Sequence, residues 1–191
     1  VYAVEDRRLH RVLALKMLSG ESTEAQRIRF IEEAQITAQL EHPNIVPVHE
    51  FGEDARGQPF FMMKRIRGRP LDDILDRLRE GDEETVEEFP QRRLLQLFAA
   101  ICHAVGFAHS KGVIHRDLTP NNVLVGPFGE IQLMDWGLAK VLRPGEIADA
   151  VETVRTRDAD RVRTQMGSVS GTPDYMAPEQ AAGEEVDHRS D

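Results

Sequence analysis

Apolar residues are grouped in short runs over the first 66 residues. Residues 1–4 and 12–18 form two such runs, and the polar residues 5–8 between them suit a turn, which predicts two paired strands. Residues 45–51 and 59–66 predict two further strands, joined by a turn that contains glycine. A small sheet is therefore expected in this part of the chain.

A helix is predicted between the two pairs of strands. Ser22 and Thr23 can cap its N-terminus, and Pro43 stops it. Its apolar residues recur at helical spacing and are Ile28, Ile31, Ala34 and Ala38. The sheet is thus expected to carry one main helix.

The pattern becomes mainly helical after Gly68. Residues 71–78 predict a short amphipathic helix, and residues 92–110 predict a longer, strongly apolar one. Two short strands follow at residues 122–125 and 131–134, joined by a turn that contains glycine and proline. A second, mainly helical lobe is therefore expected to follow the sheet.

Composition narrows the class of protein. Of the 191 residues, 40% are hydrophobic and 30% are charged, as in ordinary soluble globular proteins. The one cysteine, Cys102, excludes an intramolecular disulfide, and its apolar neighbours predict a core thiol in a reducing compartment. No apolar run approaches the length that spans a bilayer. We expect a cytoplasmic segment without membrane contact, which an anchor elsewhere in a longer protein would not contradict.

Charge bears on the choice of partner. The net charge of −9 argues against nucleic acid, because a phosphate backbone requires a clustered basic face. Acidic residues are concentrated in residues 80–88. This run is most simply a solvated loop or insertion, and the alternative is an acidic patch that recruits substrates.

Two motifs in the second half of the chain carry the chemistry. They are His115-Arg116-Asp117-Leu118-Thr119-Pro120-Asn121-Asn122 and Met134-Asp135-Trp136-Gly137. Asp117 lies five residues before Asn122, and Asp135 lies thirteen residues after Asn122. This spacing is typical of a loop and a strand end that converge on a magnesium-bound nucleotide for phosphoryl transfer.

Three further motifs occur in the order that such a site requires. They are Leu13-Ala14-Leu15-Lys16, Phe30-Ile31-Glu32-Glu33-Ala34 and Ala177-Pro178-Glu179. With all five motifs, the sequence resembles the protein kinase family over nearly its whole length, and most closely the eukaryotic-like serine/threonine kinases of bacteria.

The resemblance implies an α+β, bilobal kinase-like fold with a small antiparallel-sheet lobe, one main helix and a mainly helical large lobe. Residues 1–66 would form a partial N-terminal lobe with the hinge, and residues 67–191 a partial C-terminal lobe with the catalytic loop and activation segment. The family's glycine-rich loop would lie upstream of Val1 and its later helices after Asp191. The fold is thus expected to be truncated at both ends, and the isolated chain to be weak or inactive.

The resemblance also assigns the catalytic roles. Lys16 would hold the nucleotide phosphates and pair with Glu33, whose neighbour Glu32 cannot face the same way because a helix turns by roughly a hundred degrees per residue. Asp117 would be the base for the attacking hydroxyl, and Asn122 and Asp135 would hold Mg²⁺. The alternatives are that Lys16 is a solvated surface residue and that Asp117 and Asn122 merely cap turns. His115 is interpreted as a packed structural histidine.

ATP would lie between the two lobes. The resemblance makes Met63 the gatekeeper, residues 64–66 the hinge, and Ala14 and Leu124 the residues that sandwich adenine. Apolar residues at these places could equally be ordinary core. The expected nucleotide contacts are Val1, Ala14, Lys16, Met63, Lys64, Ile66, Leu124 and Asp135.

Residues 138–176 are long, polar and weakly periodic, and the resemblance favours a regulatory loop over a plain linker. Arg116 resembles the arginine that receives a phosphate on the kinase activation loop. Thr172 would contact the catalytic loop, and its segment resembles the serine/threonine branch of the family. The candidate phosphate acceptors are Thr153, Thr156, Thr164, Ser168 and Ser170, with Thr164 best placed by its spacing from Gly171-Thr172.

The leading hypothesis is a kinase that transfers the γ-phosphate of ATP to serine or threonine hydroxyls of proteins, with self-association for autophosphorylation. The alternative is a pseudokinase or nucleotide-binding scaffold, since Thr119 replaces the usual lysine and Trp136 the usual phenylalanine. A third reading, a small-molecule phosphotransferase, conflicts with the peptide-seating residues 171–179.

Thr119 stands where related kinases usually have a lysine. A lysine at this position would add a cation near the transferred phosphate, where charge develops in the transition state. We expect Thr119→Lys to raise turnover of the intact protein by up to roughly a hundredfold, measured with radiolabelled ATP. Equal or lower rates in the substituted protein would contradict this reading.

Overall fold

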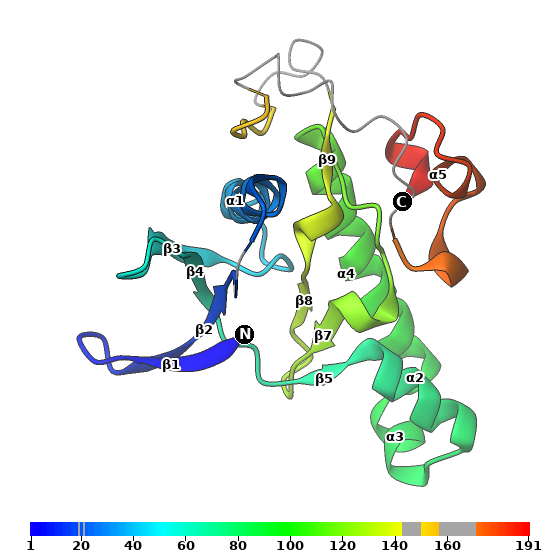
Figure 1. Cartoon of the computed structure of the whole chain (residues 1–191). Helices are drawn as coiled ribbons and strands as arrows, with labels where there is room; N and C mark the ends of the chain where they lie inside the picture. Colours follow the sequence, from blue (N-terminus) through cyan, green and yellow to red (C-terminus); the bar gives the residue numbers. More distant parts are fainter. Residues whose placement is uncertain (19, 21, 143–149, 157–170) are drawn as a thin grey trace.

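The computed structural model describes residues 1–18, 20, 22–142, 150–156 and 171–191. It has two lobes, a sheet with one long helix on the left of Figure 1 and a mainly helical lobe on the right. The predicted α+β architecture with a small sheet lobe and a mainly helical lobe is confirmed. No helix among the described residues is long and apolar enough to cross a membrane.

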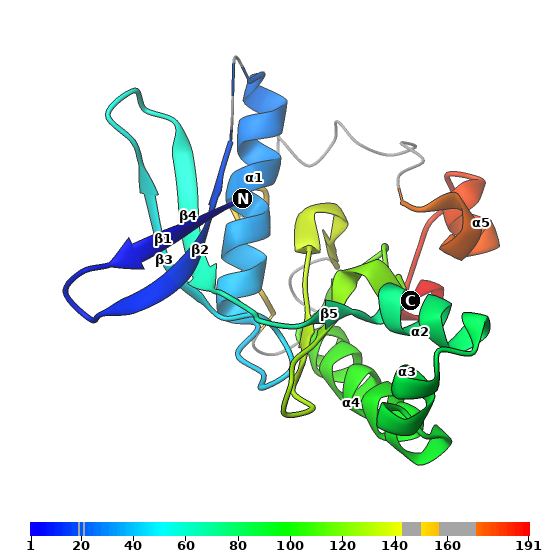
Figure 2. The ribbon, with the colours of Figure 1, turned by 90° about the horizontal axis from the view of Figure 1, so that it is seen from below.

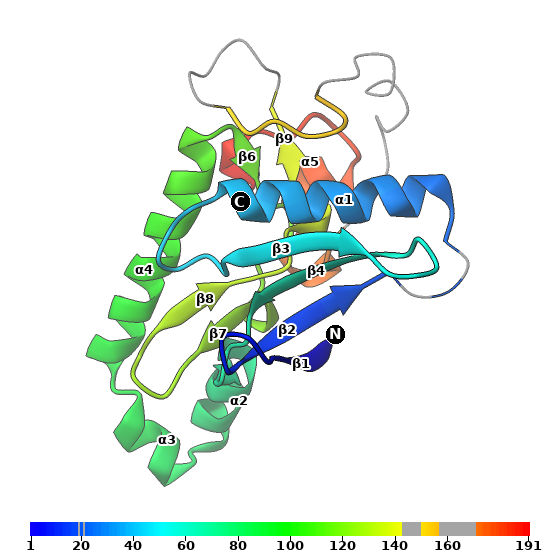
Figure 3. The same cartoon turned by 90° about the vertical axis from the view of Figure 1, so that its left-hand side faces the viewer.

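The small lobe contains a four-stranded antiparallel sheet in the order β1-β2-β4-β3. Its strands are β1 (Tyr2–Asp6), β2 (Arg11–Met17), β3 (Val48–Glu53) and β4 (Pro59–Lys64). Helix α1 (Glu24–Gln39) runs across one face of this sheet (Figure 3). The strands lie within a few residues of the predicted ones.

Helix α1 begins where the sequence predicted. Thr23 is its N-cap, and a capping box links the side chains and backbone of Thr23 and Gln26. Phe30 and Ala34 face the sheet and pack against the buried Phe61 of β4. This packing sets the position of the helix over the strands.

The segment after α1 joins the two lobes. Ile45 forms a parallel bridge with Leu133, and the backbone N–H of Leu133 donates to the carbonyl of Asn44 at 2.7 Å. The side chain of Gln132 donates to the carbonyl of Pro43 at 2.8 Å. The C-terminal end of α1 is thereby tied to the large lobe.

The large lobe is built around helix α4 (Gln91–Ser110), seen from below in Figure 2. Its short strands form two small sheets, β5-β7-β8 and β6-β9. The helices are α2 (Leu71–Glu80), α3 (Glu83–Glu88), α4 and α5 (Pro178–Ala181). The strands are β5 (Arg69–Pro70), β6 (Val113–Ile114), β7 (Val123–Val125), β8 (Ile131–Leu133) and β9 (Lys140–Val141).

Single turns of 3₁₀ helix position the loops of the large lobe. They are η1 (Pro120–Asn122), η2 (Trp136–Leu138), η4 (Pro173–Tyr175) and η5 (His188–Ser190). Two of them lie directly beside the motifs with Asp117 and Asp135. The candidate site is thus held in short, turn-rich backbone rather than in long elements.

The prediction that residues 80–88 form a loop was wrong, because most of them form α3. Asp82 caps this helix by accepting from the backbone N–H of Thr85 at 3.0 Å, and acidic residues at a helix N-terminus are favoured by the helix dipole. At the other end, Glu88 pairs with Arg69 and Arg93. The acidic run is therefore partly structural.

The prediction of a core thiol was also wrong, since Cys102 is exposed. The apolar residues of α4 occupy more than one face, and the face buried against the core contains Leu97, Ala104 and Ala108. Cys102 lies instead on the side of the exposed Phe98. A strongly apolar helix gives no single periodic stripe from which to choose the buried side.

Leu133 gives a direct test of the connection between the lobes. It is fully buried and lies in the main core cluster with Ile36 of α1 and Ile45. We expect Leu133→Ala to lower the free energy of unfolding by about 3 kcal/mol, because the deletion leaves a cavity. Phe128→Ala is the control, because Phe128 is 94% exposed at a turn and should change stability by less than about 0.5 kcal/mol. Equal effects in chemical denaturation would contradict this description of the core.

Candidate active site

Lys16 and Glu33 form an ion pair between β2 and α1. The Lys16 Nζ donates to Glu33 Oε1 at 2.5 Å, and Glu33 is 8% exposed. Burial raises the pKa of the Glu33 carboxyl, and the Lys16 ammonium opposes that rise. Glu32 points elsewhere, toward Thr153 and Arg155. Of the two adjacent acids, Glu33 is thus the one that contacts Lys16.

Asp135 lies on the open side of this pair. Its Oδ1 is 3.6 Å from Lys16 Nζ, and its side chain is 55% exposed. Its backbone is left-handed, with φ of 60°, a conformation that non-glycine residues adopt at a cost. A Cβ at Gly137 would lie 3.3 Å from Glu33 Oε2, so the backbone at Gly137 packs closely against the ion pair.

Asp117 is held from two sides. Its Oδ1 accepts from the Thr172 hydroxyl at 2.8 Å and from the Thr172 backbone N–H at 2.9 Å. Its Oδ2 accepts from Asn122 Nδ2 at 2.9 Å. Because the Asn122 amide nitrogen also donates to the Asp117 carbonyl, its oxygen is the group available to a cation.

Asp191 was not expected to act in the site, yet it fixes the catalytic loop. Its carboxylate accepts from the backbone N–H groups of His115 and Arg116, each at 2.7 Å, and from His109 Nε2 at 2.8 Å. The side chain of Asp191 is 1% exposed. These bonds hold Arg116 in its left-handed backbone conformation, with φ of 66°. The sequence offers no local pattern that predicts these contacts, because Asp191 is a single aspartate about 75 residues away from His115 and Arg116.

Gln180 is a second residue that sequence reasoning missed. Its Nε2 donates to the Arg116 carbonyl at 2.7 Å, which connects α5 to the catalytic loop. Gly171 lies against the same contact, with φ of +138°, and a Cβ there would be 2.7 Å from the Gln180 amide. Glycine is therefore required at this close approach.

His115 is structural, as predicted. Its Nε2 is 3.1 Å from the Met134 carbonyl, and its Nδ1 accepts from the Asp117 backbone N–H at 3.3 Å. Burial lowers the pKa of His115. Because Nδ1 accepts a hydrogen bond, the ring proton is placed on Nε2, which faces the Met134 carbonyl. The ring packs on Trp136 with centroids 4.6 Å apart. Trp136 shares the core cluster with Ile36 of α1, so the larger ring is accommodated in the core.

Comparison with known proteins identifies this arrangement. The model of the protein kinase domain matches residues 1–191. The chain belongs to the protein kinase family. The serine/threonine-protein kinase PknD of Protochlamydia amoebophila is 36% identical over 200 residues, which cover the whole chain and 20% of that protein.

Two other bacterial proteins show a similar likeness. The DNA damage-responsive serine/threonine-protein kinase RqkA of Deinococcus radiodurans is 38% identical over 192 residues, which cover the whole chain and 25% of RqkA. The serine/threonine-protein kinase PknB of Mycobacterium leprae is 34% identical over 196 residues, which cover the whole chain and 28% of PknB. The chain thus spans between 20% and 28% of the length of these relatives.

The residues expected to surround the nucleotide in this kinase domain lie on β2, β4 and β7 and in the segments beside β1 and β4. Ala14 of β2 is directly opposite Met63 of β4 in the sheet, and Met63 packs beside the cluster of Phe30, Ala34 and Phe61. Leu124 of β7 is opposite Pro70 of β5, close after the hinge. Lys64 and Val1 are exposed, and Ile66, Ala14 and Leu124 are partly exposed. Their backbone positions are compatible with a nucleotide between the lobes.

The donor set of the kinase domain fits a magnesium site. Asn122 offers an amide oxygen and Asp135 a half-exposed carboxylate, and Mg²⁺ bound with substrate phosphates needs only one or two protein oxygens. The described residues contain no group of three or more histidine, cysteine or acidic side chains that could hold a metal. A dedicated all-protein metal cage is therefore not found in that part of the chain.

The expected regulatory residues are divided between described and undescribed parts of the chain. Thr164, Ser168 and Ser170 lie outside the described residues. Arg116 is described, and its Nε donates to the Leu138 carbonyl at 2.6 Å. Burial lowers the pKa of Arg116, and the nearby cations Arg29 and Arg155 add to this effect. Asp191 and Glu32 oppose this lowering, so cations and acids lie close together around Arg116.

The anchor at Asp191 yields a prediction with a defined pH dependence. Burial opposes ionisation of Asp191, but the hydrogen bonds from His109 and from the backbone of Arg116 and His115 hold its pKa below the usual range. Its ionised form therefore stabilises the fold at and above the usual aspartate range, and this stability is lost as the pH falls through the depressed pKa.

We expect Asp191→Asn to lower the free energy of unfolding by about 2 kcal/mol at neutral pH, because charge-assisted hydrogen bonds are replaced by weaker ones. The loss should shrink as the pH falls below about 4, because the unfolded carboxylate is protonated there first. It should be smallest below the depressed pKa of Asp191, where the folded carboxylate is protonated too. Thermal denaturation over a series of pH values checks this. A loss that stays constant from pH 7 to pH 3 would show that the charge of Asp191 is not what stabilises the loop.

Proposed function

We propose that the protein transfers the γ-phosphate of ATP to serine or threonine hydroxyls of proteins. The observation that carries the proposal is the convergence around Asp117 of Thr172 and Asn122, beside the Lys16, Glu33 and Asp135 group. The names of the relatives, which are all serine/threonine-protein kinases, support the same activity.

The side chains have complementary tasks in this mechanism. Lys16, oriented by Glu33, would place its ammonium against the nucleotide phosphates. Asn122 and Asp135 would hold Mg²⁺, which neutralises phosphate charge when bound. Asp117 would accept a hydrogen bond from the attacking hydroxyl and take its proton. Thr172 and Asn122 hold the Asp117 carboxylate in one orientation. The reaction would therefore cost little further side-chain entropy at Asp117.

ATP would bind between the lobes. Met63, Lys64 and Ile66 would contact the edge of the adenine ring, and Ala14 and Leu124 would contact its two faces. Val1 is proposed as a further nucleotide contact. The register between Ala14 and Met63 supports this arrangement, because it puts both residues at the same level of the sheet.

Proteins with serine or threonine acceptors are the proposed substrates. Thr172 supports this choice, since its hydroxyl and backbone bond directly to Asp117 and bring the segment that precedes α5 to the catalytic loop. Self-association for autophosphorylation belongs to the same proposal. A cytoplasmic location is proposed because ATP is available there, and the net charge of −9 supports a partner other than nucleic acid.

Regulation by phosphorylation is proposed at Thr164, with Ser168 and Ser170 as further acceptors. Arg116 would pair with the new phosphate. The proximity of Arg29 and Arg155 to Arg116 supports an anion site there. The proposed boundary between the two lobes is at residues 66 and 67, between β4 and β5.

A pseudokinase is the second candidate function. Thr119 favours it, since a buried threonine, 5% exposed, takes the place of a lysine that would reach the transferred phosphate. Against it stand the retained side chains of Lys16, Asp117, Asn122 and Asp135 with their contacts. Measured phosphoryl transfer separates the two candidates.

The decisive variant is Asp117→Asn in the full-length protein. We expect transfer of radiolabelled phosphate from ATP to fall by about a hundredfold to ten-thousandfold, because the amide cannot accept the proton of the hydroxyl. Asp76→Asn on the exposed face of α2 is the matched control and should retain full activity. Label incorporation that is unaffected by Asp117→Asn would overturn the proposed function.

A further inference from the structure

Helix α1 has a contact surface besides those facing the sheet and the core. Glu32, Gln35 and Gln39 are spaced by three and four residues, so they lie on one side of the helix. Residues 150–156, called here the strap, run along this side. In Figures 1 and 3 the strap lies across α1 from the sheet. The helix is thus enclosed between the sheet and the strap.

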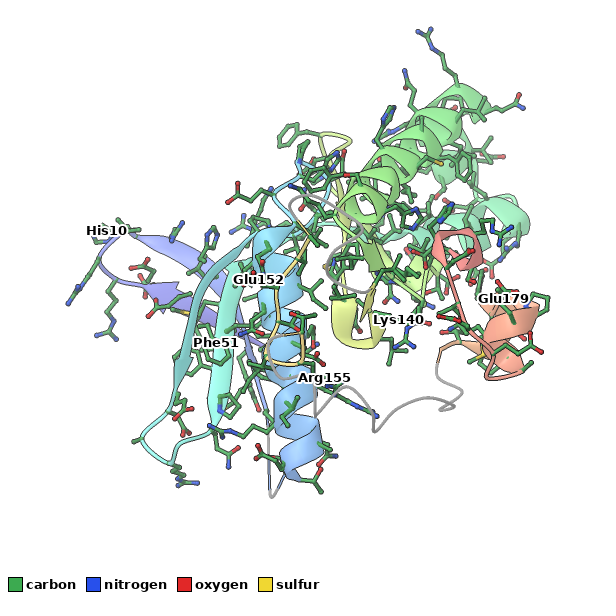
Figure 4. All side chains as sticks on the ribbon, turned by 90° about the horizontal axis from the view of Figure 1, so that it is seen from above. His10, Phe51, Lys140, Glu152, Arg155 and Glu179 are labelled. Carbon is green, nitrogen blue, oxygen red and sulfur yellow. The ribbon has the colours of Figure 1, made fainter. Side chains whose placement is uncertain are left out.

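The two glutamines bind the strap through its backbone. Gln39 Nε2 donates to the Glu152 carbonyl at 2.7 Å, and Gln39 Oε1 accepts from the Glu152 backbone N–H at 3.1 Å. Gln35 Oε1 accepts from the Val154 backbone N–H at 2.8 Å. The two side-chain amides therefore bond the strap backbone at residues 152 and 154, as the backbone of a neighbouring β-strand would. Figure 4 shows Glu152 and Arg155 beside α1.

Glu32 adds charge to the same surface. Its Oε1 accepts from the Thr153 hydroxyl at 3.3 Å, and its Oε2 is 3.0 Å from Arg155 Nη1. Burial raises the pKa of the Glu32 carboxyl, while Arg155 and the Thr153 hydroxyl counteract that rise. The strap thus supplies the groups that favour an ionised carboxylate at this half-buried place.

The strap is also ordered internally and fastened to the large lobe. Val151 and Thr153 are 3% and 2% exposed. The Val151 backbone N–H donates to the Lys111 carbonyl at 3.2 Å, directly after α4. Thr153 and Thr156 exchange hydrogen bonds through side chains and backbone in a tight turn. The strap therefore links α1 to the end of α4.

The position of α1 decides whether Glu33 reaches Lys16. Glu32 and Glu33 are adjacent, so a rotation or outward shift of α1 that withdraws Glu33 from Lys16 must also displace Glu32 from Thr153 and Arg155. The contacts of Gln35 and Gln39 resist the same displacement. Holding the strap and forming the ion pair are therefore coupled.

We propose that the strap is a built-in positioning element that holds α1 where Glu33 pairs with Lys16, with Glu32, Gln35 and Gln39 as its positioning residues. The inference rests on the proposed function, because the Lys16–Glu33 pair matters through the nucleotide phosphates. It adds a device within this chain that stabilises the paired arrangement without a phosphate.

The test uses the double variant Gln35→Ala/Gln39→Ala in the full-length protein. Binding of a fluorescent ATP analogue with Mg²⁺ and the rate of phosphoryl transfer are measured in the native and the Glu33→Gln backgrounds. We expect the double variant to weaken nucleotide binding and lower kcat by about threefold to tenfold in the native background, with the KM for protein substrate unchanged. In the Glu33→Gln background the further change should stay below about twofold.

Two additional variants sharpen the result. Gln91→Ala, at an exposed position in the first turn of α4, is the matched control and should leave both quantities unchanged. Thr153→Asp disrupts the contact from the strap side, because it sets a second carboxylate against Glu32, and should reproduce the double variant.

The outcomes separate the strap from a general structural role and from the proposed function. Losses that are equal in the native and Glu33→Gln backgrounds, or no loss from either disruption, would overturn the strap as a positioning element. Nucleotide binding does not require turnover, so it tests the strap even if the Asp117→Asn result contradicts the kinase activity. Losses confined to the native background would establish the coupling.

Discussion

The ion pair between Lys16 and Glu33 is the interaction on which the rest of the site depends. Glu33 is buried and its pKa is raised by burial, so its carboxylate is costly to keep ionised without the ammonium 2.5 Å away. The two charges come from a strand and a helix, so they meet only while the helix keeps its position against the sheet. The packing of α1 on Phe61 and its contacts with residues 150–156 restrict that position, as does the bridge between Leu133 and Ile45 in the segment after α1.

The opposite wall of the site is fixed by a different kind of constraint. Arg116 and Asp135 both have positive φ, and each is a member of one of the two catalytic motifs. Strained backbone persists only where its surroundings determine it, and the buried Asp191 carboxylate does this for Arg116 through two backbone hydrogen bonds. Electrostatics thus orders both halves of the site, through an ion pair in the small lobe and a buried carboxylate in the large one.

Much of this arrangement could be predicted from local sequence signals. Thr23 and the apolar spacing after it predict α1, and the motifs with Asp117 and Asp135 predict both the fold and the candidate site. Local sequence signals gave wrong predictions where the same composition is compatible with more than one structure. Residues 83–88 read as a solvated acidic run, yet Asp82 caps them as a helix, and the apolar surroundings of Cys102 gave no indication of which face of α4 is buried.

The contacts that could not be predicted are those between residues far apart in the chain. Asp191 bonds to the backbone of His115 and Arg116, and Gln39 bonds to Glu152, 113 residues away. Nothing in the composition around Asp191 or Gln39 specifies such partners, because a backbone N–H or carbonyl is present at almost every residue. Only the folded chain selects which ones meet.

The most direct measurement is covalent labelling of the full-length protein with an acylating ATP analogue that transfers its acyl group to a lysine beside the phosphates. If Lys16 is the cation of the nucleotide site, mass spectrometry should find it as the dominant modified lysine, and excess ATP with Mg²⁺ should protect it. Labelling spread over lysines outside the proposed nucleotide site, such as Lys111 or Lys140, or labelling of Lys16 that ATP does not reduce, would contradict the account.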